Sequence, residues 1–154
     1  MTVSRRNLFA TGAYALVGAL SLPGLASASQ AQNLMSEELI RRWYTAWKTK
    51  DFATFNNMLA DNFTFSSAAG DDHISKSTFK TQCWDTQINF IKDFDLERVT
   101  TGPNDAFVKY LCYTKNGKSF RNVEYLRIDD NRKLISIECY FGAQSSFPSA
   151  VSKG

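Results

Sequence analysis

Apolar residues recur at helical spacing in the first half of the chain and alternate with polar residues in the second half. The helical pattern predicts three helices, over residues 36–50, 51–59 and 75–84. Each begins at a residue type that caps helix N-termini: Ser36, Asp51 and Ser75. Between the second and third helices, residues 62–66 alternate and predict a short strand, and residues 67–73 are small and polar and predict a loop.

The alternating half predicts four strands joined largely by tight turns. They cover residues 91–101, 106–115, 119–128 and 133–142. Asn116-Gly117 is a strong hairpin signal between the second and third of these strands. Helices followed by long hairpin-linked strands predict an α+β fold, in which helices cover one face of a curved antiparallel sheet and leave a space beneath it. We expect one domain, residues 36–142, followed by a Ser-rich flexible tail, residues 143–154.

The N-terminus reads Ser-Arg-Arg-Asn-Leu-Phe over residues 4–9, which resembles the twin-arginine export motif. A mildly apolar stretch follows, and Ala26-Ser27-Ala28 is typical of a signal-peptide cleavage site. The alternative is a membrane anchor, but the uninterrupted apolar run is shorter than the roughly 20 residues that a span needs. We therefore expect a signal peptide over residues 1–28, a loose leader over residues 29–35, and a mature protein in the periplasm or secreted, without membrane attachment after cleavage.

Charge excludes nucleic acid as the expected partner. The formal net charge of +3 includes Arg5 and Arg6, and without them sixteen basic residues face fifteen acidic ones. The remaining basic residues are scattered along the chain, so the sequence has no basic patch of the kind that nucleic-acid-binding proteins use. A hydrophobic content of 44% and twelve Phe are enough for a true core.

Cysteine and histidine content argues against metal chemistry. The three cysteines, Cys83, Cys112 and Cys139, lack the short paired spacing of a zinc site, and His73 is the sole histidine. Three is an odd number, so at most one internal disulfide can form, and the favoured interpretation of each cysteine is a small buried apolar residue. No phosphate-binding glycine loop or nucleophile elbow occurs, so we expect neither a metal nor a cofactor.

The order of elements and several local motifs resemble the nuclear transport factor 2-like superfamily, in particular its SnoaL-like and ketosteroid-isomerase-like branch. The motifs are Trp43-Tyr44-x-Ala46-Trp47, Asp51-Phe52, the run from Leu59 to Phe65, and the last hairpin from Tyr125 to Phe141. The resemblance covers about residues 36–142. It implies a cone-shaped domain with a pocket, often a homodimer through the outer sheet face, where Arg121, Val123, Tyr125 and Arg127 would lie.

Ketosteroid isomerases of this superfamily place a phenol on the first helix, a carboxylate base after the first strand and a second carboxylic acid on a late strand. In this chain Trp43 falls at the phenol position, with Tyr44 about 100° around the helix. Ser67 falls near the base position, and Glu124 falls at the late acid position. Because two of the three groups are replaced, the resemblance does not imply steroid isomerisation by that mechanism.

Glu124 is the most informative candidate residue. Alternation places it on one face with four other residues, three of them apolar: Phe120, Asn122, Leu126 and Ile128. That face is expected to point inward, where burial would raise the pKa of the carboxyl and suit it to acid–base chemistry. Two alternatives stay open: a strand register shifted by one residue, or a position at the wet rim of the cone.

His73 is the second candidate for acid–base chemistry, because Asp71 and Asp72 precede it in a loop that borders the pocket in the resembled fold. Its alternative is an exposed loop histidine without a role, and only proximity in sequence supports a pair with Cys83. Asn122 would supply a second polar group to the pocket. The other expected ligand-binding residues are aromatic: Trp43, Tyr44, Trp47, Phe107, Tyr113 and Phe141.

Two functions follow from these residues. The favoured one is a non-catalytic binding or dimerisation module whose pocket takes a small, largely apolar organic molecule. The alternative is a cofactor-free isomerase, dehydratase or hydrolase that uses Glu124, with or without His73, as general acid or base. An inward Glu124 beside other polar groups would favour catalysis, and an outward Glu124 would exclude it.

Overall fold

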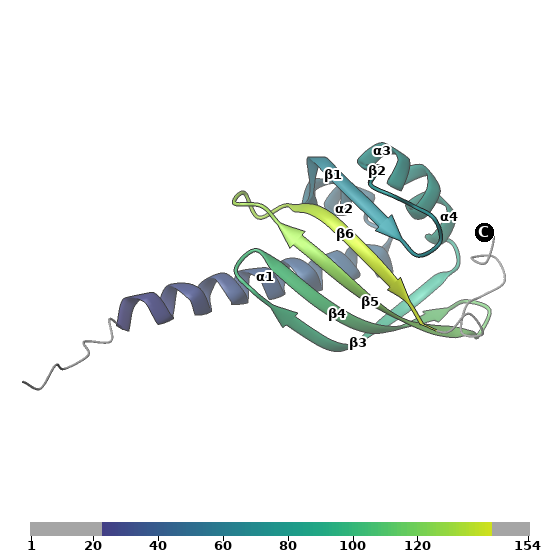
Figure 1. Cartoon of the computed structure of the whole chain (residues 1–154). Helices are drawn as coiled ribbons and strands as arrows, with labels where there is room; N and C mark the ends of the chain where they lie inside the picture. The colour runs from purple at the N-terminus through teal and green to yellow at the C-terminus, as the bar shows by residue number, and fades with distance from the viewer. Residues whose placement is uncertain (1–22, 143–154) are drawn as a thin grey trace, which may run out of the picture.

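The computed structural model describes residues 23–142, which form helices followed by a curved sheet (Figure 1). The helices are α1 (Pro23–Thr49), α2 (Phe52–Met58), α3 (Lys76–Phe79), the π-helical segment η1 (Lys80–Trp84) and α4 (Asp85–Gln87). The strands are β1 (Leu59–Ser67), β2 (Ile74–Ser75), β3 (Ile91–Thr101), β4 (Asp105–Thr114), β5 (Ser119–Ile128) and β6 (Leu134–Phe141). The expected α+β cone fold is therefore confirmed. The expected signal peptide and C-terminal tail lie largely outside the described residues.

The first helix begins earlier than the sequence predicted. Residues 29–35, expected to be a loose leader, belong to α1, whose N-terminal turns extend beyond the sheet in Figure 1. Ser36 is therefore inside the helix and does not cap it: its hydroxyl donates to the Gln32 carbonyl four residues back, at 3.0 Å. The Ala, Gln, Leu and Met residues of this segment are good helix formers, and this local propensity extends the helix past the domain.

The other two predicted caps are confirmed. The Asp51 carboxylate accepts from the Thr54 amide at 3.0 Å, and the Ser75 hydroxyl accepts from the Thr78 amide at 3.3 Å. The third predicted helix is present as α3, η1 and α4, with a wide π turn in its middle. The widened turn carries Cys83 and Trp84, both buried against the core.

The sheet has the order β2-β1-β6-β5-β4-β3. All neighbouring strands pair antiparallel except β1 and β6, which pair in parallel, so the sheet is mixed and the expectation of a wholly antiparallel sheet is corrected. The helices between β1 and β3 let β1 join the sheet beside the last strand. The inner face of the sheet closes over α1, while α2 and the α3–α4 segment lie at one end (Figure 1).

An aromatic cluster joins the helices. Phe55 stacks on Trp43 with ring centroids 4.4 Å apart and packs against Trp84 at 4.1 Å and Trp47 at 5.2 Å. Phe79 extends the same cluster toward β1. Phe55 is 1% exposed at the centre of this cluster, which packs the helices against one another. Among residues 23–142, no helix is both long and apolar enough to cross a bilayer.

Candidate functional site

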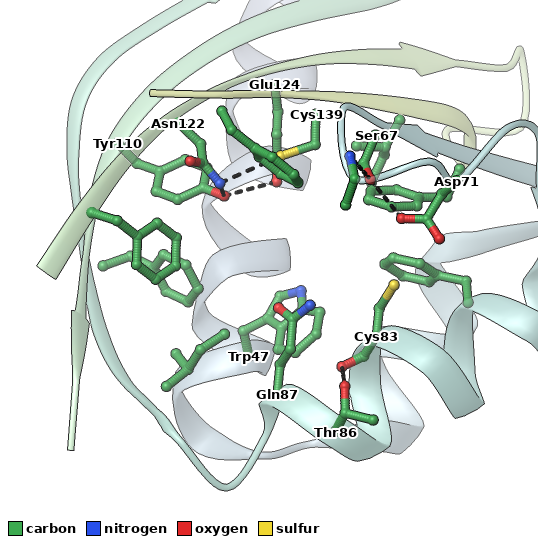
Figure 2. Close-up of a pocket in the computed structure, with 18 of the residues that line it drawn as sticks. Trp47, Ser67, Asp71, Cys83, Thr86, Gln87, Tyr110, Asn122, Glu124 and Cys139 are labelled. Atoms are coloured by element: carbon green, nitrogen blue, oxygen red, sulfur yellow. Dashed lines mark hydrogen bonds between the residues drawn. The ribbon is translucent and has the colours of Figure 1, made fainter. Parts of the chain in front are cut away.

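A cavity of about 320 Å³ lies between the inner face of the sheet and the helices (Figure 2). Its walls are largely aromatic: Trp43, Tyr44, Trp47, Phe65, Phe79, Phe90, Phe94, Tyr110, Phe120 and Phe141. The volume is at the lower end of the range for small-molecule sites. The lining also contains polar side chains: Ser67, Asp71, Gln82, Thr86, Gln87, Asn122 and Glu124. Aromatic walls combined with placed polar groups favour a compact, largely apolar molecule held in a defined orientation.

Glu124 lies at the inner end of this cavity and is only 9% exposed, so alternation along β5 placed it on the correct face. Two phenols hold its carboxylate. The Tyr44 hydroxyl, from α1, donates to Oε2 at 2.6 Å, and the Tyr110 hydroxyl, from β4, donates to Oε1 at 3.0 Å. One carboxyl group thereby connects the long helix to the centre of the sheet.

Electrostatics at Glu124 are dominated by burial. Loss of solvent raises the pKa of the Glu124 carboxyl, while the hydrogen bonds from Tyr44 and Tyr110 and the thiol of Cys139 lower it, and the net direction is upward. Burial, together with the negative charge of Glu124, raises the pKa of both phenols well above 10. The phenols therefore stay protonated and act as donors.

Asn122 lies two residues before Glu124 on β5 and is 5% exposed. Its Nδ2 donates to the Tyr110 hydroxyl at 3.0 Å and to the sulfur of Cys139 at 3.4 Å. The Tyr110 proton is directed at Glu124, so the Tyr110 oxygen can only accept, and this fixes which end of the Asn122 amide faces it. Asn122 Oδ1 is left without a hydrogen-bond partner among the described residues.

A second polar group lines the cavity where β1 ends and the following loop begins. The Ser67 hydroxyl donates to Asp71 Oδ2 at 2.5 Å, and the Ser67 amide donates to the Asp71 carbonyl at 3.0 Å. Gly70, at φ +104°, supplies the left-handed backbone that closes this turn. The side chains of Ser67 and Asp71 both line the cavity (Figure 2). Ser67 is the residue at the expected base position, and the Asp71 carboxylate lies four residues after it in the sequence.

Most of the residues expected in the pocket do line it. Trp43, Tyr44, Trp47, Asn122 and Phe141 are all part of the cavity wall. The helix positions are not as expected, however, because Tyr44 contacts Glu124 while Trp43 stacks on Phe55 in the core. Binding of a ligand by these residues remains a prediction.

Phe107 and Tyr113 do not line the cavity, which corrects two of the expected ligand contacts. Both point to the outer face of β4, where Phe107 is 52% exposed and Tyr113 is 41% exposed. Phe107 stacks on Tyr125 of β5, with ring centroids 4.6 Å apart. The physical reason is the strand pleat: in β4 the inward positions are Ala106, Val108, Tyr110, Cys112 and Thr114, and the odd-numbered residues face out.

His73 also lies away from the cavity. Its side chain is 77% exposed and contacts the carboxylate of Asp72, which is itself exposed. The residue has a left-handed backbone, φ +49°, at the turn into β2, so its side chain is directed outward. The structure therefore does not bring His73 together with Glu124 or Cys83, and it favours the interpretation of an exposed loop histidine.

Two residues that contact Glu124 were missing from the expected site. Tyr110 was not selected, although the same alternation that placed Glu124 would have placed it inward on β4. Cys139, opposite Glu124 in the β5–β6 register, was assigned only a packing role.

All three cysteines are free and buried, and burial raises the pKa of the Cys83 and Cys112 thiols to about 12. Among the described residues, no group of three or more potential ligands could hold a metal ion.

Comparisons with known proteins agree with this architecture. The sequence model of the SnoaL-like domain matches residues 40–136. No curated protein matches the chain.

Solved structures with similar folds share little sequence with the chain. An NTF2-like protein of unknown function from Cytophaga hutchinsonii has a TM-score of 0.61 at 18% identity, covering 73% of this chain and 95% of its own. A steroid delta-isomerase from Pseudomonas aeruginosa has a TM-score of 0.62 at 12% identity, with coverages of 77% and 87%. An M. tuberculosis epoxide hydrolase has a TM-score of 0.62 at 12% identity, with coverages of 80% and 93%. These similarities establish the fold.

Proposed function

The chain belongs to the SnoaL-like domain family, and from that premise we propose that its cavity binds a small, largely apolar organic molecule. The observation that supports this function is an aromatic-walled cavity of about 320 Å³ with the polar groups of Glu124 and Asn122 at one end. Apolar walls supply affinity through burial, and a few fixed polar groups supply orientation.

A cavity-filling variant tests the binding function. Cys83 lines the cavity from η1, and Figure 2 shows its sulfur beside the open space, so Cys83→Phe fills part of that space. Binding of small aromatic and terpenoid alcohols and ketones is measured by quenching of tryptophan fluorescence and by isothermal titration calorimetry. We expect Cys83→Phe to abolish binding and Val123→Phe, a matched change on the outer face, to leave it intact. Unchanged binding to Cys83→Phe would place the site elsewhere.

Cofactor-independent acid–base catalysis is the second candidate, and the buried Glu124 carboxyl favours it. Burial raises the pKa of this carboxyl, which brings it closer to the range where a group both accepts and donates protons near neutral pH. The steroid delta-isomerase and the epoxide hydrolase of the same fold make this class of chemistry reasonable for the cavity.

The catalytic candidate is tested separately from binding. Exchange of an acidic C–H of a bound ketone for solvent deuterium is followed by NMR, because this exchange requires only that a base removes and returns a proton. Glu124→Gln should abolish the exchange while the ketone still binds. Exchange at the wild-type rate in this variant would exclude Glu124 as the base and leave only the binding function.

Export and dimerisation are also proposed. The twin-arginine sequence at Arg5 and Arg6 supports export of the chain in its folded state. Replacement of both arginines by Lys should retain the chain in the cytoplasm on cell fractionation. Exposed Phe107, Val123 and Tyr140 on the outer sheet face support a homodimer. Val123→Arg should then convert the dimer to a monomer in light scattering.

A further inference from the structure

The hydrogen-bonding capacity left free at the inner end of the cavity consists of acceptors. The hydroxyls of Tyr44 and Tyr110 both donate to Glu124, and the Asn122 amide donates its N–H groups to Tyr110 and Cys139. What remains open to a ligand is the acceptor capacity of the Glu124 carboxylate beyond its bonds from Tyr44, Tyr110 and the Cys139 thiol. A ligand group that satisfies this end must therefore be a donor.

The charge of the cavity points the same way. Two of its lining residues are acidic, Glu124 and Asp71, and none of the lining residues that the structure describes is Lys, Arg or His. Within the described part of the chain, the hydrogen-bond partners of Glu124 are neutral: the phenols of Tyr44 and Tyr110 and the thiol of Cys139. A buried carboxylate without a counter-charge is costly, and a cation brought by a ligand would offset that cost. An anionic ligand would add a like charge in the same low-dielectric space.

The two phenol rings that donate to Glu124 form an aromatic group with Phe94, which contacts both of them. Tyr44, Phe94 and Tyr110 lie in mutual contact, with centroid separations of 5.1 Å, 5.3 Å and 5.4 Å, and all three line the cavity. The negative π-faces of aromatic rings attract organic cations, most strongly where water is excluded. A carboxylate beside a cluster of three rings is an arrangement that recognises ammonium groups.

We propose that the ligand of this cavity is an organic amine, whose ammonium group pairs with Glu124 while its apolar body lies between the aromatic walls. This inference rests on the proposed binding function and names the chemical class of the ligand. The ammonium donates to the Glu124 carboxylate and lies against the cluster of Tyr44, Phe94 and Tyr110. The cavity therefore selects cations over neutral molecules of the same shape, and neutral molecules over anions.

Three compounds of matched size test the selectivity: 2-phenylethylamine, 2-phenylethanol and phenylacetate. Their dissociation constants for the full chain at neutral pH are measured by isothermal titration calorimetry. We expect the amine to bind about tenfold or more tighter than the alcohol, because a charge-assisted hydrogen bond and a cation–π contact are added, and phenylacetate to bind weakest.

Three variants locate the ammonium. Glu124→Gln keeps the size of the side chain and should reduce the preference for the amine to about that of the alcohol. Glu138→Gln makes the same change on the outer face, where Glu138 accepts from Tyr140, and should leave the preference intact. Asp71→Asn removes the second negative charge of the lining and should lower the preference less than Glu124→Gln does. A loss confined to Asp71→Asn would place the ammonium beside Asp71 and overturn the assignment to Glu124.

The outcomes separate the two proposals. If 2-phenylethanol binds in the cavity as tightly as the amine, the inference of an organic cation is overturned and the binding function stands. If none of the three binds, and Cys83→Phe behaves as the wild type toward every compound tried, both are overturned. Amine selectivity that persists in Glu124→Gln would also overturn the inference, because the charge it requires is then elsewhere.

Discussion

Replacing Glu124 by glutamine should change how folding stability depends on pH. Because this carboxyl is buried, the variant should become more stable relative to the wild type as pH rises. Gln has the same shape and keeps an oxygen that accepts from one of the two phenols, so the variant removes the titration with little change in packing. Burial raises the pKa of Glu124 above its ordinary 4.5. Between 4.5 and the raised folded pKa, the folded wild type binds more protons than the unfolded chain.

The sign and size of the effect follow from proton linkage. The contribution of Glu124 to wild-type stability is fully present below pH 4.5 and is lost as pH rises through the folded pKa. The loss has a maximum slope of about 1.4 kcal/mol per pH unit. Glu124→Gln lacks this loss, so the variant should gain stability relative to wild type as pH increases from 4 to 8.

Urea unfolding followed by tryptophan fluorescence at several pH values measures this difference. The slope of free energy against urea should be the same for both proteins, which shows that only stability has changed. Carboxylates such as Asp93, whose pKa is lowered by the hydrogen bond from Lys48, are common to both proteins and cancel in the difference. Glu138→Gln serves as the control and should track the wild type. The burial argument would be refuted if the difference in unfolding free energy between the wild type and Glu124→Gln stayed constant from pH 4 to 8.

Three further perturbations test the phenol contacts, the core and the thiols. Tyr44→Phe removes a charge-assisted hydrogen bond to Glu124 and should cost about 1.5–3 kcal/mol at neutral pH in urea unfolding. Phe55→Ala, at a site only 1% exposed, should cost about 3–5 kcal/mol in the same assay, because it leaves a cavity among five rings. Cys83 and Cys112, with thiol pKa values of about 12, should resist iodoacetamide at pH 8 in the folded protein and react in urea, as followed by mass spectrometry.

Local patterns in the sequence were enough to place individual residues on faces. Alternation over residues 119–128 directed Glu124 and Asn122 inward, and the strand has the predicted bounds. The same reasoning applied to β4 would have excluded Phe107 and Tyr113 and selected Tyr110. The error at those three positions came from choosing residues by aromatic character where the pleat decides which side of the sheet they occupy.

The first helix shows where a local pattern stops being sufficient. Trp43, Tyr44 and Trp47 form one wide aromatic stripe. Such a stripe predicts that the residues are buried, but it does not predict which of them contacts the sheet and which contacts another helix. In the structure α1 is covered on two sides, so Trp43 packs against α2 while Tyr44 reaches the sheet. The assignment of Trp43 to the phenol position counted residues from Asp51. Counting residues along the chain cannot determine the rotation of a helix about its own axis when the helix is buried on both sides.

The partners of Glu124 depend on contacts between segments far apart in sequence. Tyr44 is 80 residues away, and Tyr110 reaches Glu124 because β4 pairs with β5 in the register that sets Tyr110 opposite Asn122. The pairing of β6 then sets Cys139 opposite Glu124. Alternation along one strand thus predicts that the carboxyl is buried, whereas its donors and its missing counter-charge follow only from the folded arrangement. The proposed preference for an amine therefore rests on contacts among α1, β4 and β5, and none of these segments predicts it alone.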